Sequence, residues 1–334
     1  MTLIRHLALV AAFAVVASCA VVPAPQPAAQ MPTTVAPGTA ARLAATIDPL
    51  SGDTRAHDPS VWVGAGGWWV FATGPGLQRL HSDDGTTWKR LPPVFGPGRT
   101  PAWWAQAVPS HKGVDVWAPK LFELDGRFHA MYSISSFGKN TSAIGLVSAD
   151  SPDSADWRDD GVVVQSHAGD DFNAIDPDVF VDPATRRVWM TYGSFWRGIR
   201  VTELDRATLR PIGETRFIAD HRGGIEAPTL VKRGDFWYLF VSWDFCCRGV
   251  DSTYNIRVGR ATSPLGPFTD RAGDEMLQGH AELIEESGPR WKGPGHQDVV
   301  GDLLVRHAYD AQDGGVPHLR VSTLHWSADG WPSL

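Results

Sequence analysis

One phrase of sequence recurs along the chain and constrains its fold more than any other feature. A carboxylate stands close before a proline, and an apolar run with the character of a short buried strand follows. Three copies carry an acid: His57-Asp58-Pro59-Ser60, Asn173-Ala174-Ile175-Asp176-Pro177 and Ile225-Glu226-Ala227-Pro228. If these copies are arranged around one axis, Asp58, Asp176 and Glu226 converge at one end of it.

Each phrase continues as a small antiparallel sheet. The copy that opens with Trp117-Ala118-Pro119 has strand-like runs over residues 121–124 and 128–132, separated by Asp125-Gly126, which is a strong hairpin signal. Similar phrases open at Asp58, Trp117, Asp176, Glu226 and Pro294, and no stretch keeps a helical period over several turns. Five phrases of about 50–70 residues predict an all-β fold, a five-bladed β-propeller whose first strands line a central channel.

The N-terminus has the pattern of an export signal. An apolar run over residues 7–16 follows Arg5 and His6 and is shorter than a bilayer span. Small residues lead into Cys19 and resemble a bacterial lipobox, so residues 1–19 are expected to be a lipoprotein-type signal peptide. Ordinary cleavage, with Cys19 incidental, is the alternative. Residues 20–45 are rich in proline and alanine and predict a solvated linker, which leaves residues 46–334 for an extracytoplasmic propeller, membrane-anchored or secreted.

Charge and cysteine content exclude two kinds of site. The formal net charge of −7 argues against a nucleic-acid partner, which needs a clustered basic face. Cys246 and Cys247 are adjacent, a spacing that suits neither a metal site nor a redox CxxC motif. In an exported chain they form either a vicinal disulfide or two thiols on opposite faces of a strand, and the sequence leaves both open.

Three convergent carboxylates suit the hydrolysis of a glycosidic bond. That reaction needs one protonated carboxyl group to donate to the leaving oxygen and one ionised group. A third acid beside the donor raises the pKa of the donor by like-charge repulsion. An aspartate before a proline can also simply cap a turn, but three at matching places favour a site. The aspartates without this placement are expected in turns or at the surface: Asp170, Asp171, Asp178 and Asp182.

Two histidines have places that suggest a role. His57 directly precedes Asp58. His296 lies in Gly293-Pro294-Gly295-His296, which opens the fifth phrase, so its side chain is expected to point into the channel. A channel histidine beside several acids could hold a hydrated cation, and hydrogen-bonded packing is the alternative. The remaining histidines of the folded part, His307 among them, show no ligand spacing.

The ordered set of motifs resembles glycoside hydrolase family 43 from about residue 46 to the C-terminus. Besides the acid-bearing motifs, the resemblance rests on Trp117-Ala118-Pro119, residues 135–145, Tyr192-Gly193-Ser194-Phe195-Trp196, Phe245-Cys246-Cys247-Arg248-Gly249, Ser252-Thr253-Tyr254 and Gly293-Pro294-Gly295-His296. It implies a five-bladed propeller and an inverting arabinan endo-1,5-α-L-arabinanase. By the same resemblance Asp58 is the general base, Glu226 is the general acid, and Asp176 orients the acid and raises its pKa.

The resemblance also implies ligands. Arabinan or arabino-oligosaccharides are the expected substrate of a chain acting as a monomer, and a calcium ion held largely by water is expected beside His296. The residues expected to contact the sugar are His57, Trp117, Phe137, Asn173 and Ser194.

The chain departs from the family pattern in two places. Lys120 stands where the family commonly has an acid, and a cation there is expected to alter a loop or a distal subsite. The connection between Asp176 and Glu226 is short, which would leave the groove more open. Two rival functions remain: an exo-acting or xylan-directed enzyme of the same fold, and a non-catalytic sugar-binding lipoprotein.

Overall fold

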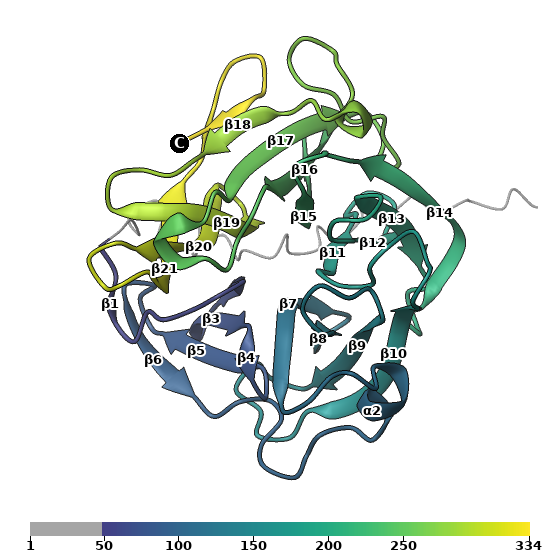
Figure 1. Ribbon diagram of the computed structural model, residues 1–334, viewed down its shortest axis with the longest axis vertical. Coiled ribbons are helices and arrows are strands. Elements are labelled where there is room, and N and C mark those ends of the chain that lie inside the picture. The colour runs from purple at the N-terminus through teal and green to yellow at the C-terminus, as the bar shows by residue number, and fades with distance from the viewer. Residues whose placement is uncertain (1–48) are drawn as a thin grey trace, which may run out of the picture. The chain divides into compact units, whose positions relative to one another are not determined.

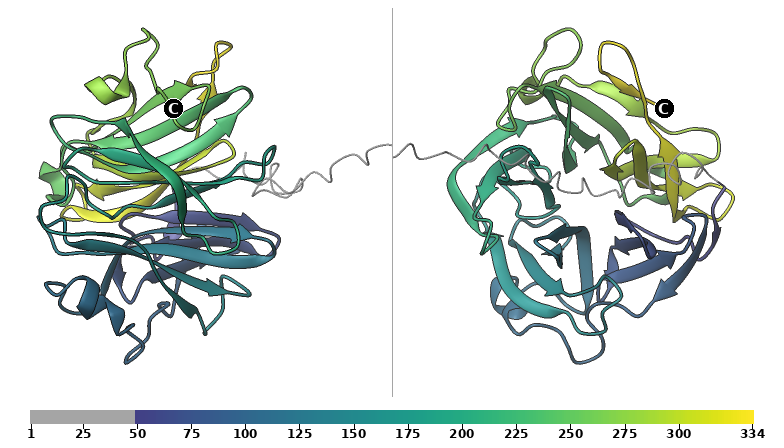
Figure 2. Two further views of the ribbon diagram at one scale, coloured as in Figure 1. Left: turned by 90° about the vertical axis from the view of Figure 1, so that its right-hand side faces the viewer. Right: turned by 180° about the vertical axis from the view of Figure 1, so that it is seen from behind.

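Residues 49–334 form five β-sheets arranged around a central axis in the computed structural model (Figures 1 and 2). The predicted all-β, five-bladed propeller is therefore confirmed. The predicted signal peptide and the whole of the predicted linker fall in residues 1–48 and lie outside the described part of the chain. Within residues 49–334, no helix has the length and apolar character that a membrane span requires.

Each blade is one sheet. Blade 1 has the order β1 (Ser51–Gly52), β6 (Thr87–Leu91), β5 (Gln78–Ser82), β3 (Gly67–Ala72) and β2 (Ser60–Gly64). Blade 2 has the order β10 (Arg158–Ser166), β9 (Ser142–Ala149), β8 (Arg127–Ile134), β7 (Asp115–Leu124) and β4 (Gly74–Pro75). Blade 3 has the order β11 (Asp178–Val181), β12 (Val188–Tyr192), β13 (Ile199–Leu204) and β14 (Pro211–Ala219).

The chain continues in the same direction around the axis. Blade 4 has the order β15 (Ile225–Arg233), β16 (Phe236–Trp243), β17 (Asn255–Ala261) and β18 (Glu282–Glu285). Blade 5 has the order β19 (Trp291–Val300), β20 (Leu303–Asp310) and β21 (Val316–Thr323). The smaller elements are α2 (Trp103–Ala107), η1 (Gly249–Asp251), η2 (Met276–Gln278) and the pair β22 (His325–Trp326) and β23 (Pro332–Ser333).

The first long strand of each blade lies nearest the axis. Strands β2, β7, β11, β15 and β19 contact one another in that order, and β19 contacts β2 again. The start of the described chain closes the ring from outside, because the backbone N–H of Leu319 donates to the carbonyl of Thr54 at 2.7 Å. An isolated β-bridge between Arg55 and His318 thus joins the start of the described chain to the last blade.

The hydrophobic core lies between the blades, as five clusters of buried side chains that each join two neighbouring sheets. Phe71 and Tyr132 belong to the cluster between blades 1 and 2, and Trp189 and Trp237 to the cluster between blades 3 and 4. Because each sheet buries both faces against its neighbours, the inner strands are held in fixed positions relative to one another. The side chains at their channel ends are therefore placed by a rigid scaffold.

The predicted hairpins occur where their turn residues allow. Asp125 and Gly126, which connect β7 to β8, both have positive φ, at 53° and 78°, as a tight turn that follows the twist of the two strands requires. Gly234 has the same role between β15 and β16.

A left-handed residue precedes the proline at the channel mouth in each of the first four blades. The four are Asp58 (φ 50°), Ala118 (φ 46°), Asp176 (φ 58°) and Ala227 (φ 54°). Residues before proline normally adopt an extended conformation, and left-handed non-glycine residues concentrate at functional sites. The acids do not all occupy the same place in the repeat: Asp58 and Asp176 are themselves the left-handed residue, whereas Glu226 comes one residue before it. The ladder of β15 and β16 is interrupted there, between Glu226 and Thr229.

Candidate active site

The structure brings the three predicted acids together at the mouth of the channel. Asp58, Asp176 and Glu226 come from blades 1, 3 and 4 and are 8%, 6% and 8% exposed. The backbone N–H of Ala227 donates to Oδ2 of Asp176 at 3.1 Å, so Asp176 holds the segment that carries Glu226. The negative charges of Glu226 and Asp58 both act on Asp176. The three carboxyl groups are thus largely buried, but each keeps a small exposed fraction through which it can reach a bound molecule.

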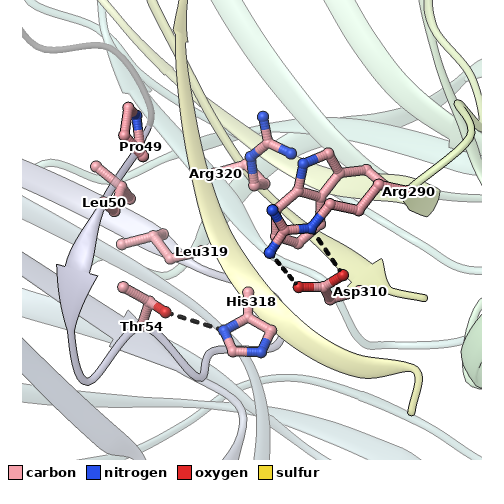
Figure 3. A pocket seen from close by; sticks show the side chains of 9 residues that line it. Pro49, Leu50, Thr54, Arg290, Asp310, His318, Leu319 and Arg320 are labelled. Carbon is pink, nitrogen blue, oxygen red and sulfur yellow. Dashed lines mark hydrogen bonds and ion pairs between the residues drawn. The ribbon is translucent and has the colours of Figure 1, made fainter. Parts of the chain in front are cut away.

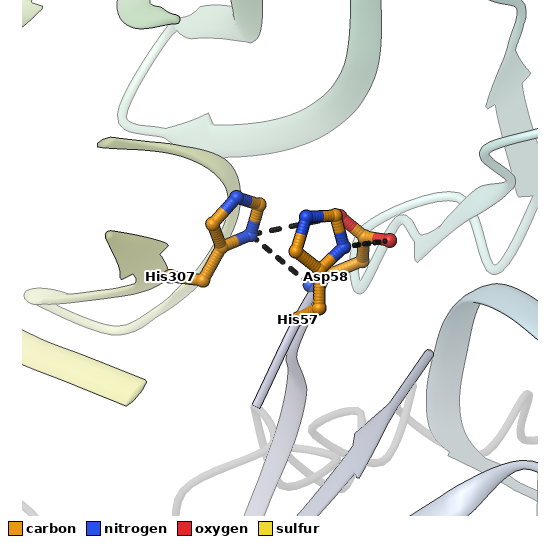
Figure 4. Close-up of side chains that lie close together, drawn as sticks. All are labelled: His57, Asp58 and His307. Carbon is orange, nitrogen blue, oxygen red and sulfur yellow. Dashed lines mark hydrogen bonds and ion pairs between the residues drawn. The ribbon is translucent and has the colours of Figure 1, made fainter. Parts of the chain in front are cut away.

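His57 and His307 lie beside Asp58 (Figure 4), and Thr73 and His296 also contact its carboxylate. Thr73 Oγ1 donates to its Oδ2 at 2.5 Å, and Nδ1 of His57 lies 2.8 Å from the same oxygen. Nδ1 of His296 lies 3.3 Å from Oδ1, and the backbone N–H of Asp58 donates to Nδ1 of His307 at 3.1 Å. These contacts fix both the backbone and the carboxylate of the residue.

Electrostatics keep Asp58 ionised. Burial disfavours its charged form, but the surrounding histidines, His57 foremost, together outweigh burial and hold the pKa of Asp58 well below its ordinary value. Burial also opposes the charge on His57, yet the Asp58 carboxylate raises the pKa of His57. Because burial lowers the pKa of His296 and of His307, those rings are neutral at neutral pH. The Asp58 carboxylate therefore favours an additional proton on His57 more than on His296 or His307.

Glu226 has the opposite tendency. Burial raises its pKa and the negative charge of Asp58 adds to that rise, while hydrogen bonds from two hydroxyl groups oppose it. These donors are Tyr254, whose hydroxyl lies 2.7 Å from Oε1, and Ser194, whose Oγ lies 2.7 Å from Oε2. One acid is thus held ionised while the other is favoured in its protonated form, as general acid–base chemistry requires.

Asp176 and Glu226 titrate as a pair. Burial raises the pKa of Asp176 well above its ordinary value, and the charge of Glu226 raises it further. Like-charge repulsion is mutual, so ionising one of these carboxyl groups makes ionisation of the other less favourable. The pair therefore retains a proton at a pH where an isolated carboxyl group has lost it.

The residues predicted to contact a sugar lie in different environments. Ser194 and His57 are already hydrogen-bonded to Glu226 and Asp58. Trp117 is partly buried, whereas Phe137 is 80% exposed. Asn173 is buried, and its Oδ1 has no hydrogen-bond partner among the residues that the structure describes. An aromatic face open to solvent and an unpaired amide oxygen are both features that a sugar can satisfy.

Lys120, expected from the sequence to alter a loop or a distal subsite, lies on an inner strand and contacts neither. Its ammonium group is inside the channel, 2.7 Å from Oδ1 of Asp178 and 2.8 Å from Oδ1 of Asp298. Asp178 is 3% exposed, so its expected place in a turn or at the surface is also wrong. Asp182 is in the turn that the sequence predicted, where it accepts a hydrogen bond from Thr185, although it is buried.

The donor set around His296 fits a calcium ion only if water supplies nearly all the ligands. Calcium takes six to eight oxygen ligands, mostly carboxylates and carbonyls. The channel carboxylates of Asp178 and Asp298 are paired with Lys120, and Asp58 is engaged by its own donors. His57, Asp58 and His307 offer ligand atoms within 4.8 Å of one another, but hydrogen bonds already occupy Nδ1 of both rings.

Four residues of the site were not predicted from the sequence: Thr73, Tyr254, His307 and Tyr309, whose hydroxyl lies 2.8 Å from Nε2 of His57. Tyr254 belongs to the motif Ser252-Thr253-Tyr254, but nothing in the sequence pairs it with Glu226. His307 and Tyr309 alternate along β20 and therefore share one face of it, which is the signal that could have identified them. His307 has no metal-ligand spacing in the sequence, and its Nδ1 instead accepts the backbone N–H of Asp58.

The adjacent cysteines, which the sequence left open, form a disulfide bond. Cys247 is exposed and its Sγ lies 4.0 Å from Nε2 of His57. The disulfide therefore lies at the edge of the acidic site.

A separate hollow of about 290 Å³ lies on blade 5, where the described chain begins (Figure 3). Arg290 crosses it to pair with Asp310 at 2.7 Å, and His318 forms part of its wall. None of the three acids lines this hollow. It is distinct from the site at the channel mouth.

Comparison with known proteins gives a consistent result. Residues 51–332 match the family described as glycosyl hydrolases family 43. The chain is 42% identical over 310 residues to a Bacillus subtilis (strain 168) protein named extracellular endo-α-(1→5)-L-arabinanase 1, covering 90% of this chain and 92% of the relative. It is 37% identical over 302 residues to a Cellvibrio japonicus (strain Ueda107) protein named extracellular exo-α-(1→5)-L-arabinofuranosidase ArbA, covering 83% and 86%. A solved structure of a GH43 endo-arabinanase from Bacillus licheniformis superposes with a TM-score of 0.82 at 45% identity, covering 85% of this chain and 99% of that one.

Proposed function

The chain belongs to glycosyl hydrolases family 43, and on this premise we propose that it cleaves internal α-1,5-L-arabinofuranosidic linkages of arabinan. One observation carries the proposal: Asp58 and Glu226 face the same channel mouth, with the pKa of the first held low and that of the second raised. The B. subtilis and B. licheniformis relatives are both named as endo-acting arabinanases, which supports arabinan as substrate and endo cleavage. The relative named as exo-acting defines the alternative.

In the proposed reaction Asp58 is the general base. Its ionised carboxylate removes a proton from a water molecule as the water oxygen attacks the anomeric carbon of the arabinose unit. Contacts from Thr73 and His57 hold Oδ2 in place, so that the carboxylate does not have to reorient during the reaction. Attack from the face opposite the leaving oxygen inverts the anomeric configuration.

Glu226 is proposed as the general acid. It donates its proton to the glycosidic oxygen as the bond to the anomeric carbon breaks, and the shortened chain leaves as an alcohol. Asp176 keeps the proton available, because repulsion between the two carboxylates disfavours ionisation of the pair. The proton that Asp58 has taken is then lost to solvent and Glu226 is reprotonated, which restores the starting state.

Substrate contacts are proposed for the residues around the acids. Phe137, exposed at the surface, offers an aromatic face to the apolar side of a furanose ring. Trp117 is proposed for a neighbouring subsite, and the unpaired Oδ1 of Asn173 would accept a hydrogen bond from a sugar hydroxyl. His57 and Ser194 would contact the substrate through atoms not engaged by Asp58 and Glu226.

A hydrated calcium ion beside His296 is proposed as a supporting charge. The ring of His296 would hold it through one nitrogen, with water as the remaining ligands. When bound, the ion would supply positive charge that helps to keep the channel carboxylates ionised. It has no part in the proton transfers described above.

An extracytoplasmic location is supported by two relatives that are named extracellular. We propose further that Cys19 is lipidated and tethers the enzyme to a membrane, with residues 20–45 as the linker and the propeller acting as a monomer. Metabolic labelling with a fatty-acid analogue tests the tether: wild type should incorporate the label and Cys19→Ala should not. Equal labelling of both would remove the lipidation.

Product analysis on debranched arabinan tests the function. An endo enzyme releases a mixture of oligosaccharides at the earliest times, with arabinose only later. Arabinose or one short oligosaccharide from the outset would indicate exo action. Binding without hydrolysis would indicate a non-catalytic sugar-binding protein, and faster hydrolysis of xylan would overturn the substrate assignment.

A further inference from the structure

A chain of hydrogen bonds joins the disulfide to Asp58. The backbone N–H of Cys247 donates to the hydroxyl oxygen of Tyr309 at 2.8 Å. That oxygen lies 2.8 Å from Nε2 of His57, whose Nδ1 lies 2.8 Å from Oδ2 of Asp58. The members come from blade 1, from β20 of blade 5 and from the loop after β16 of blade 4, so the chain connects three blades at the channel mouth.

The hydrogen bonds of His57 determine which of its ring nitrogens carries a proton: Nδ1, which faces Asp58, always does. The Tyr309 hydroxyl has one hydrogen and two lone pairs, and the Cys247 N–H, which can only donate, takes one lone pair. If the hydroxyl donates to Nε2, the neutral ring must carry its proton on Nδ1. If Nε2–H donates to the hydroxyl, the 2.8 Å contact between Nδ1 and the carboxylate of Asp58, which can only accept, still requires a proton on Nδ1, and the ring is then a cation. In both cases Nδ1–H points to Asp58.

The disulfide determines where the Cys247 N–H points. A bond between the sulfurs of neighbouring residues closes a small covalent ring that includes the peptide joining them, which restricts rotation of the backbone at both residues. Cys247 adopts the left-handed conformation (φ 66°), which a non-glycine residue rarely keeps unless it is held there. Beyond it, the N–H of Arg248 donates to Ser252 Oγ at 3.0 Å, which secures the far side of the turn.

Tyr309 is well placed to transmit this constraint. It is 3% exposed, and its ring contacts that of His307, whose Nδ1 accepts the backbone N–H of Asp58. Its phenol therefore cannot follow a moving loop, and a displaced Cys247 would leave the hydroxyl with one donor fewer.

We propose that Tyr309 and the Cys246–Cys247 disulfide are positioning elements for the general base, acting through His57, and that reduction of the disulfide lowers the turnover number. This inference rests on the proposed function, since it presupposes that Asp58 acts as the base. A dithiol reductant such as dithiothreitol donates two electrons and two protons to the disulfide, giving two thiols and its own cyclic disulfide. The change is reversible on reoxidation.

Kinetics of Tyr309→Phe in the full chain test the first half. The variant keeps the ring and its packing but removes the hydroxyl. We expect kcat on debranched arabinan to fall by about tenfold with KM unchanged, since small displacements of a catalytic group can cost up to about a hundredfold. Tyr238→Phe is the matched control, because Tyr238 donates its hydroxyl to the carbonyl of Gly330, far along the chain from the acids. It should retain wild-type kinetics.

A second substrate separates a base defect from general damage. A 4-nitrophenyl arabino-oligosaccharide has a leaving group that needs little protonation, so its hydrolysis still depends on the base but hardly on the acid. Tyr309→Phe should lose the same factor on this substrate as on arabinan. If Tyr309→Phe has wild-type activity on the activated substrate, or if its defect is a higher KM with unchanged kcat, the positioning role is overturned.

Reduction of the wild-type chain tests the second half without any substitution. After dithiothreitol treatment, with thiol titration showing that the bond is open, kcat should fall by at least about fivefold and recover on reoxidation. The variant Cys246→Ser with Cys247→Ser should resemble the reduced enzyme and ignore the reductant. Unchanged kcat in fully reduced wild type would refute the role of the disulfide, whereas an untreated wild type inactive on arabinan would refute the proposed function itself.

Discussion

Inside the channel, the ammonium group of Lys120 lies 2.7 Å from Oδ1 of Asp178. Asp178 follows Asp176 by two positions in the sequence. The same ammonium lies 2.8 Å from Oδ1 of Asp298, whose other oxygen accepts hydrogen bonds from Ser60 and the backbone of Val61. Oδ2 of Asp178 accepts the backbone N–H of Leu230 at 2.8 Å. One buried cation therefore links the inner strands of all five blades.

Replacement of this cation should destabilise the propeller. Lys120→Met keeps most of the aliphatic stem but leaves two buried carboxylates unpaired, which typically costs about 3–5 kcal/mol of unfolding free energy. Nearby carboxylates raise the pKa of Lys120 despite its burial, so its stabilisation is complete below the pKa of an unfolded lysine, about 10.4, and is lost only above it. Urea unfolding at several pH values around neutrality should show the loss throughout.

Lys89→Met is the control for that experiment, because Lys89 is exposed on blade 1. Its effect should stay within about 0.5 kcal/mol. Equal stabilities for the two variants would show that the channel does not need the Lys120 charge.

The two proposed catalytic acids should respond differently to the leaving group. Asp58→Asn and Glu226→Gln should each lower kcat on arabinan by about 10²–10⁴-fold, the usual contribution of general acid–base catalysis. On a 4-nitrophenyl arabino-oligosaccharide, Glu226→Gln should regain most of its activity, whereas Asp58→Asn should remain impaired. The exposed Glu214 provides a control as Glu214→Gln. Recovery in Asp58→Asn instead would mean that the roles are exchanged.

Asp176→Asn should move the basic limb of the pH–rate profile. Ionised Asp176 and ionised Glu226 repel each other, and an asparagine cannot ionise, so the substitution removes this repulsion and lowers the pKa of Glu226. The protonated, active form of Glu226 is then lost at lower pH, and the basic limb of kcat/KM shifts in that direction. The surface variant Asp171→Asn should leave the limb unchanged. A limb that stays in place in Asp176→Asn would contradict the assigned role.

Removal of calcium should have a small effect that depends on His296. Water would supply most of the ligands, so we expect chelation to lower the melting temperature by a few degrees at most, with recovery on adding calcium. In His296→Ala, chelation should no longer change the melting temperature. Elemental analysis that finds no metal in the purified protein, together with an unchanged melting temperature after chelation, would remove the ion from the account.

The repeat was readable from the sequence because its signals are local. Prolines at the channel mouth, apolar runs and turns such as Asp125-Gly126 each depend on neighbouring residues, so the fold and the convergence of the three acids were predictable. The left-handed residue before the proline in each of the first four blades was not predictable, because a residue before a proline ordinarily adopts an extended backbone.

Contacts between blades were not readable in the same way. Lys120, Asp178 and Asp298 are far apart in the sequence and meet only when the ring closes, so Asp178 was wrongly expected in a turn or at the surface and the ion pairs of Lys120 were not predicted. The partners of Asp58 and Glu226 have the same origin, since Tyr309 and Tyr254 reach the acids from other blades or other strands. A pairing of this kind has no period or spacing that a single sequence can reveal.

The anomeric configuration of the first product tests the central claim, that Asp58 activates water on one side of the linkage while Glu226 protonates the other. Hydrolysis of debranched arabinan can be followed by proton NMR at early times. If Asp58 is the base and Glu226 the acid, β-configured reducing ends appear first and the α anomer grows in only by mutarotation. An initial product with the α configuration would contradict it, because the two acids would then be acting as nucleophile and acid rather than as base and acid.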